Sequence, residues 1–110
     1  MRQRRPRVHD PKHLRFVRGR LCLVCGDNTS VEAAHIRMAD PRIGKPMVGM
    51  GEKPDDRYTV PLCSRCHQDQ HKHNERAWWA DKHRDPILIA LALHSHSGDQ
   101  EMGETIVRGY

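Results

Sequence analysis

Two Cys-x-x-Cys pairs, Cys22/Cys25 and Cys63/Cys66, constrain the fold more than any other feature of this sequence. Each pair can present two thiolates from one tight turn, and two such pairs match the tetrahedral geometry of a structural zinc site. The chain needs such a link, because only 36% of its 110 residues are hydrophobic and a core this small supplies about 3–5 kcal/mol by itself. We therefore predict a coordinatively closed four-cysteine zinc site that builds the fold; four unliganded thiols are the alternative.

Positive charge is concentrated at the N-terminus of the chain. Residues 1–20 contain eight Lys or Arg and one acid, whereas the other 90 residues contain eleven basic and thirteen acidic side chains. A basic segment on a nearly neutral body suits a polyanion, and we predict DNA as the partner; a solvated tail that only aids solubility is the alternative. The basic residues assigned to nucleic acid are Arg2, Arg4, Arg5 and Arg7, joined by Arg37 and Lys53 further along the chain.

The sequence predicts neither a secretory signal nor a membrane-spanning segment. The charged N-terminus is not followed by the 7–15 apolar residues of a signal peptide. No apolar stretch approaches the ~20 residues that a bilayer requires. We therefore expect a cytoplasmic protein without a membrane partner, in a compartment where cysteines stay reduced.

The order of elements predicts one small α+β domain at 11–94, between a basic disordered arm at 1–10 and a mobile tail at 95–110. Within the domain we expect strands at 31–37 and 58–62, a long loop at 38–56, and helices at 11–17, 64–73, 75–82 and 87–94. Trp78 and Trp79 are assigned to the core, with one of them half-buried, because neighbouring residues on a helix cannot share a face.

Three histidines could form a second metal-dependent site. His67 and His71 are four residues apart on a predicted helix, so their imidazoles can share one metal ion; an exposed polar helix rich in His is the alternative. A lone histidine on a strand, such as His35, is more often structural than catalytic. A hairpin followed by the helix would nevertheless bring all three histidines to one face.

In their order and spacing, these motifs resemble the HNH (ββα-metal) endonuclease family. The matching stretches are Cys22-x-x-Cys25, Ala34-His35-Ile36 and Val60-Pro61-Leu62-Cys63-x-x-Cys66-His67-x-x-x-His71. A phage-type subgroup similar to the RecA-dependent phage nuclease is closer still, through His35-Ile36-Arg37, Lys53-Pro54-Asp55-Asp56 and Trp78-Trp79. The resemblance covers about residues 10–93. It implies a ββα-metal core stapled by the four-cysteine zinc site, with extra C-terminal helices.

The resemblance also implies an activity, that of a metal-dependent DNA endonuclease or nickase hydrolysing phosphodiester bonds. His35 takes the position of the general base, and His67 with His71 takes the position of ligands to a second divalent cation: Mg²⁺, Mn²⁺, Ni²⁺ or Zn²⁺. A recombination or phage protein is a further expected partner.

Two residues depart from the family pattern. Ala34 stands where many members have a metal-binding Asp or His, and Tyr58 stands near the position of the family's Asn. Asp55 and Asp56, just before the second strand, are the best candidates for the missing ligand. Ala34 also favours the main alternative function, a non-catalytic zinc-stabilised module that binds nucleic acid. An adaptor whose zinc site only scaffolds a protein-binding surface is a third class.

Overall fold

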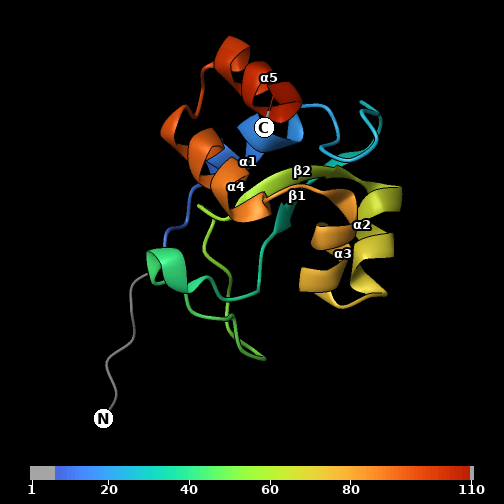
Figure 1. Ribbon diagram of the computed structural model, residues 1–110. Coiled ribbons are helices and arrows are strands. Elements are labelled where there is room, and N and C mark those ends of the chain that lie inside the picture. Colours follow the sequence, from blue (N-terminus) through green and yellow to red (C-terminus); the bar gives the residue numbers. More distant parts are fainter. Residues whose placement is uncertain (1–6, 110) are drawn as a thin grey trace.

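In the computed structural model, residues 7–109 are described, and they form helices around a two-stranded sheet (Figure 1). The elements in chain order are α1 (Pro11–Arg18), β1 (Val31–His35), the 3-10 helix η1 (Pro41–Ile43), β2 (Thr59–Cys63), α2 (Ser64–His71), α3 (Glu75–Lys82), α4 (Pro86–Ser95) and α5 (Gln100–Gly109). The small α+β class is as predicted. The predicted DNA contacts of Arg2, Arg4 and Arg5 lie outside the described residues.

The sheet is an antiparallel pair in which Val31 lies opposite Cys63 and His35 lies opposite Thr59. Every residue of β2 is buried, and this apolar partner stabilises β1 although alanines at 33 and 34 have low strand propensity. Pro61 lacks an N–H, which is tolerated because each strand of a two-stranded sheet has an outer edge. Its carbonyl accepts a hydrogen bond from the Leu23 N–H at 2.9 Å.

The helices begin largely where the sequence predicts. Asp10 caps α1 by accepting a hydrogen bond from the His13 N–H, and Asp85 caps α4 in the same way; each is followed by a proline at the first helical position. Helix α2 begins directly after Cys63, which occupies the N-cap position without a side-chain cap hydrogen bond. The strand therefore passes directly into the helix at a cysteine.

The core lies where α1 and α4 contact the sheet and where α2 closes its Cys63 end, with α3 returning beside α2 (Figure 1). Trp78 and Trp79 are both buried, at 5% and 2% exposure, so the expectation that one is half-buried is wrong. The two rings pack edge to face with their centroids 4.9 Å apart, and the Trp78 Nε1–H donates a hydrogen bond to the Asp69 carboxylate of α2. The two tryptophans point to different faces of α3, and both of these faces are covered by other parts of the domain. Across residues 7–109 no helix is long and apolar enough to cross a bilayer.

The C-terminal residues depart from the predicted mobile tail, because 100–109 form the helix α5. Ile106 and Val107 are buried at 3% and 4% exposure. Gly103 lets α5 approach α1 closely, since a Cβ there would lie 2.7 Å from the Phe16 ring. The composition of the segment gives little sign of this helix, because only one face of it is apolar. That face is stabilised by packing against α4 and against Phe16 of α1.

Polar contacts add to the docking of α5. The buried guanidinium of Arg20 donates to the Gln100 carbonyl at 3.2 Å and to the Glu104 carboxylate at 2.8 Å. Asp99 accepts a hydrogen bond from the Met102 N–H at the start of the helix. In the sequence Arg20 is only part of the basic N-terminal charge, whereas in the fold it holds the two ends of the domain together.

Candidate functional site

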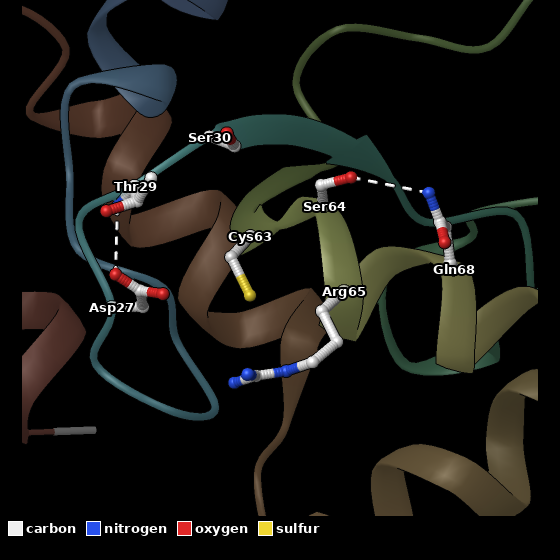
Figure 2. A pocket seen from close by; sticks show the side chains of 7 residues that line it. All are labelled: Asp27, Thr29, Ser30, Cys63, Ser64, Arg65 and Gln68. Atoms are coloured by element: carbon white, nitrogen blue, oxygen red, sulfur yellow. Dashed lines mark hydrogen bonds between the residues drawn. The ribbon is translucent and has the colours of Figure 1, made fainter.

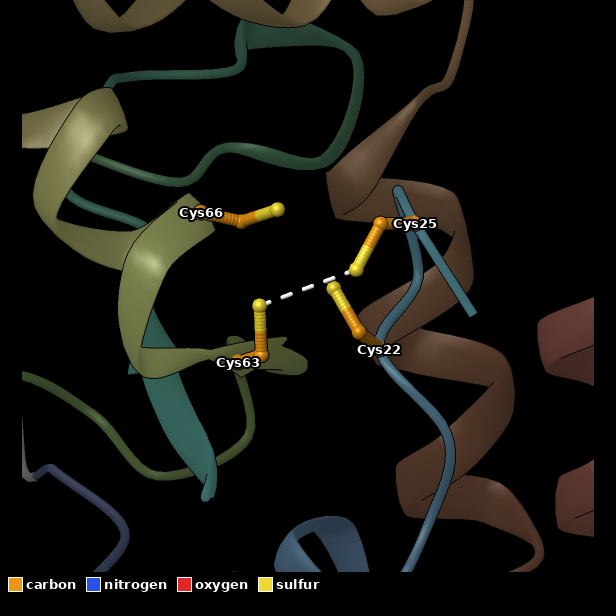
Figure 3. Close-up of side chains that lie close together, drawn as sticks. All are labelled: Cys22, Cys25, Cys63 and Cys66. Atoms are coloured by element: carbon orange, nitrogen blue, oxygen red, sulfur yellow. Dashed lines mark hydrogen bonds between the residues drawn. The ribbon is translucent and has the colours of Figure 1, made fainter. Parts of the chain in front are cut away.

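The four cysteines converge, as predicted, into one cluster that could hold a metal ion (Figure 3). Their sulfur atoms all lie within 4.8 Å of one another, and the Cys25 and Cys63 sulfurs are 3.7 Å apart. Only Cys25 of the four is exposed. Within residues 7–109, no other group of three or more His, Cys, Asp or Glu residues meets this distance. Four sulfur donors at this spacing are compatible with a structural zinc ion.

Local backbone geometry shapes the first cysteine pair. Gly26 has a φ of +78°, a value that favours glycine. Its N–H donates to the Cys22 carbonyl at 2.9 Å, and the Cys22 N–H donates to the Asp27 carbonyl at 2.8 Å. The chain thus reverses directly after Cys25, which turns both sulfurs toward the second pair at the junction of β2 and α2.

The thiols differ in how readily they ionise. Burial disfavours the Cys22 thiolate, but hydrogen bonds from the backbone at Cys25, Cys63 and Val24 outweigh burial and lower the pKa of Cys22 to about 7. Partial desolvation, together with the neighbouring cysteine side chains, raises the pKa values of Cys25 and Cys66. Because a metal ion binds thiolates, its binding to this cluster must release protons.

An exposed cation, Arg65, accompanies the cysteine cluster. It lies inside the second Cys-x-x-Cys spacer, and its side chain extends past Cys63 in the direction of Asp27 (Figure 2). The nearby thiolates of Cys25 and Cys63 raise the pKa of Arg65. The attraction is mutual, so Arg65 favours the ionised cysteines. Arg65 was not among the residues predicted from the sequence, although its position between two candidate zinc ligands was a usable signal.

The opposite end of the hairpin contains a histidine–carboxylate pair. The Nε2 of His35 lies 2.8 Å from the Oδ1 of Asp56; the His35 side chain is 26% exposed and that of Asp56 is 4% exposed. The other carboxylate oxygen accepts the Asp10 N–H at 2.8 Å and lies 3.6 Å from the Nδ1 of His9. The carboxylate is therefore held by the N-terminal end of the domain.

This pairing determines which His35 nitrogen is basic. Burial opposes ionisation of Asp56, but the hydrogen bonds from Asp10 and His35 outweigh burial, so the pKa of Asp56 is lowered. An ionised carboxylate only accepts hydrogen bonds, so the proton of a neutral His35 ring resides on Nε2. The Nδ1 atom is then the basic nitrogen of the ring.

Asp55 and Asp56, the candidates for the missing metal ligand, are hydrogen-bonded to other side chains. Asp56 pairs with His35, and Asp55 accepts hydrogen bonds from the Arg57 guanidinium at 2.8 and 3.1 Å. In the described part of the chain, neither forms a close ligand group with the α2 histidines. The reason is topological: the two aspartates precede the Thr59 end of β2, whereas α2 begins at the Cys63 end.

The α2 histidines have a different partner. The Nδ1 of His67 lies 2.6 Å from the Oε1 of Glu32 on β1, and the His67 and His71 rings are 4.7 Å apart between centroids. Within residues 7–109, His35 forms no close ligand group with them, and its own hydrogen-bond partner is Asp56. Sequence reasoning missed Glu32, although strand alternation places it on the same face as Ala34. Ala34 itself is buried and has no side-chain donor atom.

The predicted DNA-binding residues that the structure describes lie on or beside the long loop. An Arg7 guanidinium nitrogen donates to the Pro54 carbonyl at 2.9 Å. Arg37 donates to the Gly49 carbonyl at 3.3 Å, and Lys53 is exposed. Arg7 thereby joins the N-terminal segment to the residues that lead into Asp56.

Residues 1–97 match the family described as Protein of unknown function (DUF968). No curated protein and no solved structure matches the chain. The matched residues include the four cysteines, the His35–Asp56 pair and the Glu32–His67–His71 group. Helix α5 lies beyond the matched residues.

Proposed function

Since the chain belongs to the DUF968 family, whose description names no activity, we propose a function from its own residues: a metal-dependent DNA endonuclease or nickase of the HNH type. One observation carries the proposal. A partly exposed imidazole, His35, is held at 2.8 Å by a buried carboxylate, Asp56. A histidine oriented in this way is suited to general-base catalysis at neutral pH. The resemblance of the Cys63–His71 segment to the HNH nucleases gives the reaction class.

In the proposed reaction, the Nδ1 of His35 removes a proton from a water molecule as the water oxygen attacks the scissile phosphorus. The bond from phosphorus to the 3′ oxygen breaks, and that oxygen takes a proton from solvent. Asp56 holds the His35 ring and stabilises the imidazolium that forms, so it is a positioning residue. His35 later returns its proton to solvent.

The proposed chemistry uses two kinds of metal site. The four thiolates fit a structural zinc ion, which would be coordinatively closed and would serve the fold. His67 and His71 present adjacent imidazoles that suit a second divalent cation: Mg²⁺, Mn²⁺, Ni²⁺ or Zn²⁺. A cation bound there would stabilise negative charge on the phosphate and on the departing oxygen.

DNA is the proposed substrate because basic side chains lie on or contact the loop between His35, where β1 ends, and Thr59, where β2 begins. Arg7 and Arg37 donate hydrogen bonds to carbonyls of this loop, and Lys53 is exposed on it. Side chains of this type position a nucleic-acid backbone through its phosphates without reading its sequence.

The test is a nicking assay with zinc-loaded protein, supercoiled plasmid and Mg²⁺, Mn²⁺ or Ni²⁺. The His35→Ala variant is expected to lose about 10²–10⁴-fold in rate, the usual contribution of a positioned general base. His73→Ala is the matched control, because His73 is exposed and its ion-pair partner, Asp69, is also exposed. Equal nicking by both variants would contradict the proposed role of His35.

Ala34 favours a second candidate, a non-catalytic zinc-stabilised module that binds nucleic acid. This position offers no metal donor and is only 3% exposed. The module is expected to bind DNA, in fluorescence anisotropy, with an affinity that falls steeply with salt, and to cleave it with none of the three metals. Binding without nicking by a folded, zinc-loaded protein would therefore favour this candidate over the nuclease.

A further inference from the structure

A carboxylate on β1 faces a histidine on α2. Glu32 lies opposite Leu62 in the sheet, and α2 begins two residues after Leu62. One turn into the helix, His67 lies beside β1, with its Nδ1 2.6 Å from the Glu32 Oε1. The Glu32 side chain is 48% exposed and the His67 side chain 23% exposed, so both remain accessible from solvent.

A second imidazole follows on the same face of α2. His71 is exposed, one helical turn after His67, and the ring centroids are 4.7 Å apart at an interplanar angle of 63°. The pair and the Glu32 carboxylate together offer two nitrogen donors and one oxygen donor. A set of two imidazoles and one carboxylate, with coordination positions left open, is a known arrangement for divalent transition metals.

We propose that Glu32, His67 and His71 form a divalent transition-metal site, with Glu32 as its third protein ligand. This inference rests on the proposed function, in which the α2 histidines hold the second cation. The three donor atoms do not all lie within 4.8 Å of one another, so rotation of the exposed His71 or Glu32 side chain completes the site. Two imidazoles favour Mn²⁺, Ni²⁺ or Zn²⁺ over Ca²⁺, which prefers oxygen ligands throughout.

Glu32 suits this role better than the two aspartates that the sequence suggested. Asp55 is held by Arg57, and Asp56 is held by both His35 and the Asp10 N–H. The hydrogen-bond partner of the Glu32 carboxylate, in contrast, is itself a candidate metal ligand. A cation between them would replace a hydrogen bond on an accessible surface, where neither side chain has to leave a buried partner.

The test measures metal binding by protein whose cysteine cluster has first been filled with one equivalent of zinc. Mn²⁺ is then titrated and followed by electron paramagnetic resonance, and by the broadening of imidazole signals in NMR spectra. Substoichiometric Mn²⁺ is expected to broaden the His67 and His71 signals first. Glu32→Gln and His71→Ala are each expected to weaken Mn²⁺ binding by at least about tenfold.

Two controls separate ligand loss from a general change in surface charge. Glu101→Gln removes an exposed carboxylate on α5, and His73→Ala removes an exposed imidazole two residues beyond His71. Both variants are expected to bind Mn²⁺ as the parent does. Circular dichroism of Glu32→Gln checks that the fold is intact.

The outcomes distinguish this site from the proposed activity. Parental Mn²⁺ affinity in Glu32→Gln, or no Mn²⁺ binding by the parent, would overturn the site even if plasmid is nicked. Mn²⁺ binding that depends on Glu32 and His71 supports the site even if no plasmid is nicked, and in that case the nuclease proposal alone fails.

Discussion

The two ends of one short hairpin are built for different tasks. At the Val31–Cys63 end, mostly buried sulfur atoms meet within 4.8 Å of one another. At the His35–Thr59 end, a partly exposed imidazole is held by one buried carboxylate. The first end brings together four sulfur atoms that a metal ion can link, whereas the second end keeps an imidazole partly exposed to solvent.

This difference teaches how a chain with a small core can support a reactive site. Strand β1 is only five residues long. Contacts that hold one end of the strand in place therefore also restrict the position of the other end. A tightly held cysteine end can therefore keep His35 in place without many contacts around it. The two ends should respond differently to substitution, and four predictions test this difference.

The largest effect is expected from Cys63→Ser at the cysteine end. Structural zinc contributes about 10 kcal/mol or more in small zinc domains, which is comparable with the whole stability of a domain. The variant should lose its bound zinc and its cooperative thermal unfolding, as measured by atomic emission and circular dichroism. Ser64→Ala, in the same turn with all thiols intact, should retain both. A zinc-free Cys63→Ser protein that still unfolds cooperatively would contradict the closed-site interpretation.

At the histidine end, Asp56→Asn is expected to impair activity far more than structure. Asparagine can present an N–H to the His35 Nε2 and so favour the other ring tautomer, and the expected loss of nicking rate is about a hundredfold or more. Nitrogen-15 NMR of the ring should show the proton moving from Nε2 to Nδ1, a change that a purely structural role would not produce. An unchanged tautomer with unchanged nicking would remove Asp56 from the mechanism.

The same carboxylate should make a pH-dependent contribution to stability. The pKa of Asp56 is lowered in the folded protein, so its contribution is present above the unfolded-state pKa of about 3.9 and is lost as the pH falls through the folded-state value. The difference in thermal midpoint between the parent and Asp56→Asn should be larger at neutral pH than below about pH 4, where it should shrink.

The control for this pH experiment is Asp81→Asn, because the Asp81 side chain is 79% exposed. It should show little difference from the parent at any pH. An Asp56→Asn difference that persists undiminished to low pH would mean that the Asp56 charge does not stabilise the fold.

The smallest effect is expected from Arg65→Ala, which removes an exposed cation beside the thiolates. Exposed charges contribute weakly, so zinc transfer to a chelator should accelerate by only about two- to fivefold. The acceleration should be smaller at high salt, and Arg65→Lys should behave like the parent. Equal transfer rates for parent and Arg65→Ala at low salt would show that the thiolates do not need this cation.

Local rules predicted much of the fold. The Asp-Pro pairs at 10–11 and 85–86 mark helix starts through capping, which depends only on neighbouring residues. The spacing of the cysteines predicted their convergence, because each pair is fixed by its own turn and the closed site requires all four. These features could be read from the sequence because their causes lie within a few residues.

The contacts around the histidines could not be read in this way. Asp56 pairs with His35 because the loop after β1 leads back to the sheet at Thr59, opposite His35. Glu32 contacts His67 because α2 places this histidine beside β1. Both contacts depend on how elements that are distant in the sequence are oriented relative to one another in the fold. Helix α5 was missed for a related reason, since its stability comes from α1 and α4 rather than from its own composition.

The contact between α1 and α5 also sets an order of events during protein synthesis. The cysteine set is complete once Cys66 has been made, whereas Phe16 and Arg20 must wait for residues 100–107. At about 5–20 residues per second, the roughly forty intervening residues take about 2–8 s. A nascent chain can therefore fill the cysteine cluster with a metal ion while one side of α1 is still uncovered, and helix α5 covers that side afterwards.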